Sequence, residues 1–229
     1  MSLADFTRPG IWTELFPYAL ELMDHLETVS DNCRWTFGGG TVLMLRINHR
    51  HSKDIDLFVS DPQFLPYVSP RLSDVAERLT DDYVENAEFI KLNFPQGEID
   101  IVVGASLTPS PFDIVTYRGR SIRVETSAEI LAKKFHHRGD RAKVRDLFDL
   151  CAIAALEPSA IELAAPFMVR HGRAFLDLIQ DGSASLSEQF AQIETIDFWP
   201  TYEECVDTAL RTVGPLIGDT GSRPKHPRP

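Results

Sequence analysis

The stretch around three consecutive glycines constrains the fold more than any other part of the sequence. A short apolar and aromatic run, Cys33 to Phe37, precedes these glycines, and the next seven residues, TVLMLRI, have the composition of a helix. The segment KDIDLFV then alternates acidic or aromatic side chains with Ile55, Leu57 and Val59, as a strand with one polar face does. The order strand, glycine turn, helix and strand predicts an α/β fold for this part of the chain.

The same stretch contains the residue types of a metal and phosphate site. Glycine lets backbone amides approach a phosphate closely, and a helix N-terminus adds a partial positive charge. Asp54 and Asp56 are two apart on one strand face, and Mg²⁺ is usually held by one or two carboxylates together with substrate phosphates. A third carboxylate is expected from the segment GEIDIVVG, with Asp100 as first choice and Glu98 as the alternative. Paired aspartates alone are more often surface residues, but the nearby glycine turn favours a functional site.

Other periodic segments extend the α/β pattern and then change to a helical one. Apolar residues at helical spacing predict a helix over residues 11–29, where Ile11, Leu15, Tyr18 and Leu22 share a face. A second helix is expected over 69–79, and a hairpin over 88–94 and 98–103 with Gln96 and Gly97 as its turn. Short strands at 114–117 and 121–124 follow, then a helix capped by Thr126 or Ser127, and further helices start near 144 and cover 159–180, 186–193 and 201–212.

This pattern predicts two domains and a tail. Residues 1–126 form the α/β part, and residues 127–217 form a helical part. Residues 218–229 contain three prolines and no apolar residue, so we expect them to be disordered.

The charge balance excludes general adhesion to nucleic acid or to an anionic membrane, because 23 Lys and Arg face 34 Asp and Glu, a net charge of −11. Nine of the 23 basic residues are nevertheless concentrated, three at positions 46, 50 and 53 and six within 133–145. These two stretches favour a local polyanion site over a merely solvated face. The neighbouring histidines, His49, His51, His136 and His137, lack zinc-site spacing, so we expect phosphate contact or surface roles for them.

The three cysteines are far apart in the sequence, without the spacing of a zinc or dithiol motif. They are expected to be buried thiols in a reducing compartment. The sequence shows neither a basic stretch followed by an apolar run at its start nor a long apolar window. These features predict a cytoplasmic location with no membrane partner.

These motifs together resemble the nucleotidyltransferase superfamily that includes DNA polymerase β, and within it the AbiEii-like toxins of bacterial abortive-infection and toxin–antitoxin systems. The resemblance rests on three blocks in family order between residues 37 and 150, which are GGT, RHSKDIDLF and the later KK…RDLFDL. It implies an α+β fold, with a mixed sheet and flanking helices, followed by a helical C-terminal domain that completes the active-site cleft.

The resemblance also implies roles for individual residues. The catalytic set would include Lys134, or the adjacent Lys133, and Asp146 of the RD motif. Arg138 and Arg145 of the basic stretch are expected to hold the acceptor. The metal ligands would be Asp54, Asp56 and Asp100, and the nucleotide-binding residues would be Gly39, Gly40, Thr41, Arg50, Ser52 and Lys53.

The expected reaction is Mg²⁺-dependent (or Mn²⁺-dependent) transfer of a nucleoside monophosphate from an NTP to an acceptor hydroxyl, with release of pyrophosphate. The resemblance implies RNA, in particular the 3′ end of tRNA, as acceptor, and a cognate antitoxin as partner. A protein side chain or a small molecule such as an antibiotic remains an alternative acceptor. A catalytically silent nucleotide- or antitoxin-binding module and a metal-dependent phosphohydrolase are the two rival functions.

Overall fold

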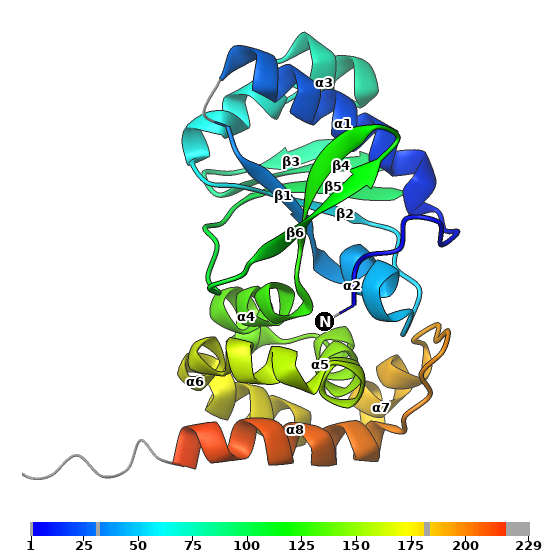
Figure 1. The fold of residues 1–229 in the computed structure, drawn as a ribbon, viewed down its shortest axis with the longest axis vertical. Coiled ribbons are helices and arrows are strands. Elements are labelled where there is room, and N and C mark those ends of the chain that lie inside the picture. Colours follow the sequence, from blue (N-terminus) through cyan, green and yellow to red (C-terminus); the bar gives the residue numbers. More distant parts are fainter. Residues whose placement is uncertain (1, 31–32, 181–183, 219–229) are drawn as a thin grey trace, which may run out of the picture. The chain divides into compact units, whose positions relative to one another are not determined.

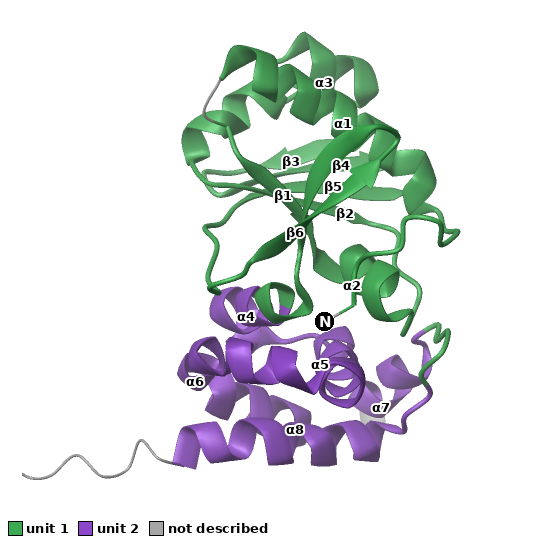
Figure 2. Cartoon of the chain, in the orientation of Figure 1, with its two compact units in different colours: residues 1–130, 194–198 green, residues 131–193, 199–229 purple. Residues whose placement is uncertain are grey.

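The computed structural model describes residues 2–30, 33–180 and 184–218. The chain divides into two compact units, one formed by residues 1–130 with 194–198 and the other by residues 131–193 with 199–229 (Figure 2). The first unit contains a sheet with its flanking helices, and the second is helical (Figure 1). The predicted change from an α/β to a helical part is therefore confirmed.

The first unit is built on a seven-stranded mixed sheet with the order β3-β4-β5-β2-β1-β7-β6. The two central strands join its parts: β1 pairs antiparallel with β2 and parallel with β7, and β2 pairs parallel with β5. The mixed sheet expected from the sequence is thus confirmed. Its strands are β1 (Trp35–Gly38), β2 (Ile55–Val59), β3 (Tyr83–Glu85), β4 (Phe89–Phe94), β5 (Gly97–Val103), β6 (Phe112–Tyr117) and β7 (Arg120–Glu125).

Helices α1 (Trp12–Val29) and α3 (Asp74–Leu79) lie together on one face of this sheet (Figure 1). Leu15 and Leu22 of the predicted inward face of α1 are fully buried, but Ile11 and Tyr18 are exposed. Trp12 and Phe16 are buried instead. The rings of Phe16 and Phe37, on β1, lie 4.7 Å apart and anchor the helix to the sheet. The first unit also contains helix α2 (Gly39–Ile47) and the 3-10 helix η1 (Pro62–Val68).

Three local differences from the predicted elements have physical causes. The helix predicted from residue 69 begins only at Asp74, because the Ser73 side chain accepts a hydrogen bond from the Ala76 amide and caps it there. The turn of the β4–β5 hairpin is Pro95–Gln96, since Gly97 already pairs with Phe94. The edge strand β3 was not predicted because it has only three residues.

The second unit is a group of packed helices. Helix α4 (Ser127–Arg138) begins in the first unit and ends in the second, and Thr126 is its cap, since its hydroxyl accepts from the Glu129 amide at 3.3 Å. The rings of Phe135 and Phe175, 4.7 Å apart, belong to the second unit's core. Its other helices are η2 (Gly139–Arg141), α5 (Val144–Leu156), α6 (Pro158–Gln180), α7 (Ala184–Ala191) and α8 (Tyr202–Gly218).

Several global expectations can be compared with these elements. The three cysteines are free and buried, as predicted. Within the described residues, no helix is long and apolar enough to cross a membrane. Of the predicted tail, Gly218 is the last residue of α8, and residues 219–229 lie outside the described residues.

A segment late in the sequence, residues 194–198, returns to the first unit and was not predicted. The His51 amide donates to the Glu194 carbonyl at 2.8 Å, and the Ile196 amide donates to the His49 carbonyl at 3.1 Å. Thr195 also forms a β-bridge with Arg50. These backbone bonds fix the loop that leads into Asp54 and β2.

Candidate active site

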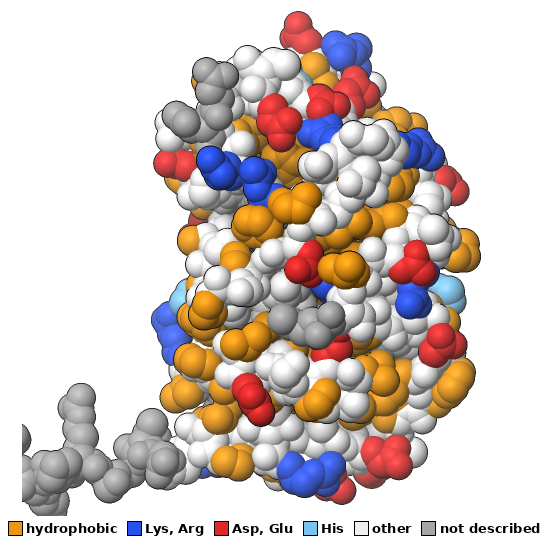
Figure 3. Space-filling view, in the orientation of Figure 1, with side chains coloured by type: hydrophobic (Ala, Val, Ile, Leu, Met, Phe, Trp, Pro, Cys, Tyr) orange, Lys and Arg blue, Asp and Glu red, His pale blue; other side chains and the backbone are white. Residues whose placement is uncertain are grey.

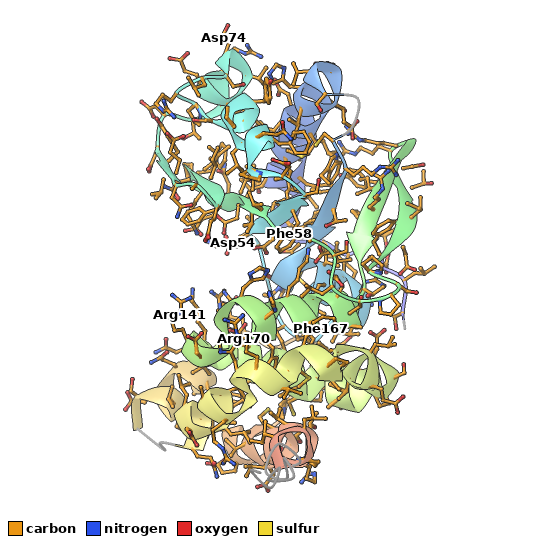
Figure 4. The ribbon with its side chains drawn as sticks, turned by 90° about the vertical axis from the view of Figure 1, so that its left-hand side faces the viewer. Asp54, Phe58, Asp74, Arg141, Phe167 and Arg170 are labelled. Carbon is orange, nitrogen blue, oxygen red and sulfur yellow. The ribbon has the colours of Figure 1, made fainter. Side chains whose placement is uncertain are left out.

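A row of side chains crosses four neighbouring strands of the first unit. Gly38 on β1 is opposite Asp56 on β2, Asp56 is opposite Asp100 on β5, and Asp100 is opposite Lys91 on β4. Residues that are directly opposite each other in a sheet project to the same face, so this row brings the glycine turn and two of the predicted carboxylates together. Figure 4 shows Asp54 and Phe58, from the same part of the chain, near one another in the first unit.

The glycine turn is required by the closeness of Asp56. Gly39 has a φ of +72°, and a Cβ atom there would lie only 1.8 Å from Asp56 Oδ2. The carboxylate therefore lies directly against the backbone of the first residue of α2. At Gly40, a Cβ atom would lie 2.9 Å from Ser52 Oγ, so Ser52 is also next to the turn. Only glycine at position 39 combines the left-handed backbone with this close approach.

The loop before β2 is fixed from α2. Thr41 is completely buried, and its hydroxyl donates to the Asp54 carbonyl at 2.6 Å and lies 3.1 Å from Ser52 Oγ. Arg50 is also buried and donates to the His51 carbonyl at 3.1 Å. Lys53, in contrast, is exposed. These contacts show Thr41 and Arg50 shaping the loop that carries the predicted metal ligands.

Asp54 is held by the hairpin that follows. Its Oδ1 atom accepts a hydrogen bond from the Glu98 amide at 3.1 Å, and a Cβ atom at Gly97 would lie 2.9 Å from the same oxygen. Gly97 thus permits the close approach of β5 to the Asp54 carboxylate. Strand β5 begins at Gly97, one residue earlier than predicted, and the same glycine leaves room for the Asp54 carboxylate.

Asp100 is a carboxyl group of the row with a strongly raised pKa. Burial raises its pKa to about 6, the negative charge of Asp56 adds to the rise, and the ammonium of Lys91 opposes it. One of its oxygens, Oδ1, is buried without a hydrogen-bond partner. A raised pKa and an unsatisfied buried oxygen are both expected of a carboxylate that ligates a cation during function.

Lys91 is a site residue that the sequence analysis missed. Its Nζ atom hydrogen-bonds Glu98 and lies 3.3 Å from Asp100 Oδ2, and its side chain is 29% exposed. Burial alone disfavours the charged ammonium, but the hydrogen bond and charge of Glu98 and the charge of Asp100 outweigh it and raise the pKa of Lys91. Lys91 is therefore a fixed positive charge at neutral pH.

The donor set fits a Mg²⁺ ion that binds together with its substrate. Among the described residues, no three His, Cys, Asp or Glu side chains are grouped closely enough to form a metal centre by themselves. Asp56 and Asp100 are nevertheless adjacent, and the free Oδ1 atom of Asp100 needs a partner. Mg²⁺ is usually held by one or two carboxylates and completed by substrate phosphates, which is the arrangement these residues suit.

A second cluster of predicted residues lies within the second unit. Lys134 Nζ is 2.5 Å from Asp146 Oδ1 and 2.9 Å from Asp149 Oδ2, and Arg138 also contacts Asp146, at 2.7 Å. Asp146 additionally accepts from the Lys143 amide at 2.9 Å at the start of α5. Lys134, which the sequence motif pointed to, therefore contacts both acids of the RD motif in the structure. Lys133 is buried too.

The remaining cations have different roles. Arg46 is buried and binds Asp113 at 2.8 Å and the Glu125 and Val124 carbonyls at 2.7 and 3.0 Å, so it is a structural residue and does not belong to a polyanion site. Arg145 is exposed on α5. Arg141 is 77% exposed on η2, which packs on α6, and Figure 4 shows it near Arg170 of that helix. On the face shown in Figure 3, acidic and basic side chains are interspersed.

Replacement of Lys134 by Met is expected to destabilise the fold by about 3 kcal/mol, because removing the cation that contacts both buried carboxylates leaves their negative charges less fully neutralised. The side chain of Asp149 is fully buried, and that of Asp146 is 5% exposed. Urea unfolding measures this loss, with the exposed Arg173→Met as the matched control in the same unit. Equal stabilities of the two variants would contradict the prediction that the ion pairs of Lys134 stabilise the fold.

The stability of the fold is expected to fall in acid through Asp146. Burial alone would raise its pKa, but the charges of Lys134 and Arg138 outweigh burial and lower it to about 2. A carboxylate with a depressed folded-state pKa stabilises the fold above its unfolded-state pKa, and this stability is lost as the pH falls from about 4 to 2. The Asp146→Asn variant should show a smaller loss than the wild type over this range in thermal unfolding. If the variant lost as much stability as the wild type, protonation of Asp146 would not be the cause of the acid destabilisation.

Comparison with known proteins places these motifs in one family. The family profile of the nucleotidyl transferase AbiEii toxin of type IV toxin–antitoxin systems matches residues 21–209. No curated protein is similar in sequence to the chain.

Several solved structures align with most of the chain at low sequence identity and with TM-scores below 0.5. JHP933 from Helicobacter pylori is 15% identical, with a TM-score of 0.49 and coverage of 87% of this chain and 90% of that one. MenT4, a nucleotidyltransferase toxin from Mycobacterium tuberculosis, is 17% identical, with a TM-score of 0.45 and coverage of 91% and 84%. The antibiotic-resistance factor ANT(2'')-Ia is 13% identical, with a TM-score of 0.47 and coverage of 74% and 97%.

Proposed function

Because the chain belongs to the AbiEii family of nucleotidyltransferase toxins, we propose that it moves a nucleoside monophosphate from an NTP to an acceptor hydroxyl and releases pyrophosphate. The observation that carries this proposal is the row in which the Gly38–Gly39 turn lies against Asp56, with Asp100 on the next strand. It combines a phosphate-binding turn with two carboxylates, the minimum for metal-assisted nucleotide chemistry.

The residues of the first unit would bind the phosphates of the NTP and the metal ion. The amides at Gly39 and Gly40, at the start of α2, would bind phosphate oxygens, with Ser52 and Lys53 beside them. Asp54, Asp56 and Asp100 would hold Mg²⁺ or Mn²⁺ together with those phosphates. When bound, the metal would neutralise the charge that develops on the leaving pyrophosphate and lower the pKa of the attacking hydroxyl.

In the second unit, Lys134 would bind nucleotide phosphate, while Asp146 and Asp149 hold its ammonium group in place. Positioning by two buried carboxylates restricts this long side chain to one location, which lowers the conformational entropy it loses on binding phosphate. Asp146 is itself fixed by Arg138 and by the start of α5.

RNA, in particular the 3′ end of tRNA, is the acceptor that we propose. The basic segment with Arg138 and Arg145, to which the structure adds the exposed Arg141, would hold its phosphates. Such contacts weaken steeply with salt, because counterions that phosphate binding releases compete at high concentration. As a toxin of this family, the chain would be controlled by a cognate antitoxin, and its site of action would be the cytoplasm.

The test is incubation of the purified protein with each of the four α-labelled NTPs, Mg²⁺ and total bacterial RNA, beside an Asp56→Ala control. Label in tRNA-sized RNA that the control lacks supports the proposal and identifies the base. Label in protein would overturn RNA as acceptor and establish a protein-modifying enzyme. No label in either would favour a small-molecule acceptor or a catalytically silent module.

A further inference from the structure

The carboxylate row ends at a lysine that the proposed chemistry does not use. Lys91 lies directly opposite Asp100, and beyond it the row continues only with the exposed, apolar Val84 on the edge strand β3. Its Nζ atom is placed between two carboxylates of β5, Glu98 and Asp100. The ammonium group is therefore part of the site's charge pattern.

The geometry divides the two oxygens of Asp100 between two cations. Asp100 Oδ2 lies 3.3 Å from Lys91 Nζ, whereas Oδ1 is buried and has no hydrogen-bond partner. A carboxylate that already neutralises an ammonium through one oxygen is a weaker ligand for a divalent ion through the other. The ammonium also repels any cation near that oxygen, and this repulsion is strong because the Asp100 side chain is only 21% exposed.

We propose that Lys91 is a built-in counter-cation of the carboxylate row, which weakens the binding of free divalent ions so that metal is held tightly only when it arrives with nucleotide phosphates. This inference rests on the proposed function. Lys91 is a positioning residue, since it acts through Asp100 and not on the reacting atoms.

Three carboxylates in and beside the row already have partners among the described residues. Asp54 is turned to the Glu98 amide, and Glu98 and Asp100 share one ammonium. All three of these acidic groups thus have a partner before any metal binds. A metal ion with bound triphosphate carries a net negative charge, so Lys91 attracts this complex while it repels the free ion.

The test measures Mn²⁺ binding to the full chain without nucleotide, by calorimetry and by the electron paramagnetic resonance signal of free Mn²⁺. The Lys91→Met variant keeps the length of the side chain and removes its charge, and we expect it to bind Mn²⁺ at least about tenfold more tightly than the wild type. Lys91→Arg keeps the charge and should bind Mn²⁺ as weakly as the wild type.

Two controls separate this effect from a general change in charge or packing. Arg78 on α3 pairs with Glu21 at 3.5 Å in the helical layer of the same unit, so Arg78→Met removes the same charge away from the row and should leave Mn²⁺ affinity unchanged. In an Asp100→Asn background, the gain from Lys91→Met should disappear, because the proposed effect acts through Asp100.

A lysine that only joins β4 to β5 would give the opposite result. Lys91→Met would then lose stability and show unchanged or weaker Mn²⁺ affinity, and this outcome would overturn the proposal. If Lys91→Met does not fold, Lys91→Gln, which keeps a donor for Glu98, replaces it under the same criterion. Because the assay contains no nucleotide, failure of NMP transfer would leave its outcome intact, and an unchanged Mn²⁺ affinity would leave the transferase proposal intact.

Discussion

The Asp56→Asn variant is expected to lose NMP transfer by about a thousandfold or more while its free energy of unfolding stays the same or rises slightly. Asparagine has the shape of aspartate, so it still fits against Gly39. It lacks the charge that would hold the metal, and it removes the repulsion that helps to raise the pKa of Asp100. A loss of activity without a loss of stability is typical of a residue kept for function.

The measurement compares transfer of α-labelled NMP with urea unfolding for the same protein samples. Asp74→Asn is the matched control, because Asp74 lies at the exposed start of α3 and Figure 4 shows it far from Asp54 in the first unit. It should retain full activity. Activity of Asp56→Asn within a few fold of the wild type would remove Asp56 from the site.

The Gly39→Ala variant is expected to lose both stability, by about 2 kcal/mol or more, and most of its activity. Alanine at a φ of +72° is strained, and its Cβ atom would collide with the Asp56 carboxylate at 1.8 Å. Relief of the collision must move either α2 or Asp56, and each movement separates the phosphate-binding turn from the carboxylates. Urea unfolding and the transfer assay measure the two losses.

Gly119 supplies a control that separates strain from collision. It also has a positive φ, +82°, in the β6–β7 turn, but a Cβ atom there would meet nothing within 4 Å. Gly119→Ala should therefore show only the backbone strain, about 1 kcal/mol, and full activity. If Gly39→Ala were no less stable than Gly119→Ala and equally active, the close contact between the turn and Asp56 would not exist in solution.

Local sequence patterns predicted most elements of the fold and the principal acids. They did not predict that Lys91 lies opposite Asp100, because that pairing depends on the exact turn between β4 and β5. Alternation along residues 54–59 and 98–103 identified the strands and the polar faces that carry Asp56 and Asp100. A turn at Gln96–Gly97 would pair Lys91 with Val102, whereas the observed turn at Pro95–Gln96 pairs it with Asp100. A shift of one residue in a hairpin turn thus hid Lys91, because register depends on turn geometry.

Contacts between distant segments could not be predicted from single-residue periodicity. Residues 194–198 pair with the loop around Arg50, more than 140 positions earlier, and nothing in their composition indicates a bridge. Arg46 looked like one of a group of cations but is neutralised by Asp113, which lies 67 positions away. Lys134 and Asp146 were expected only to share a site through one family motif, and the structure adds the ion pair that joins them between neighbouring helices.

The reaction class itself is tested most directly by following the α- and γ-phosphates of one NTP in the same reaction. Our account predicts that the α-label enters the acceptor while an equal amount of γ-label appears in pyrophosphate, and that Asp56→Asn abolishes both. Release of the γ-label as inorganic phosphate, or equal turnover in wild type and Asp56→Asn, would contradict nucleotidyl transfer by this carboxylate site.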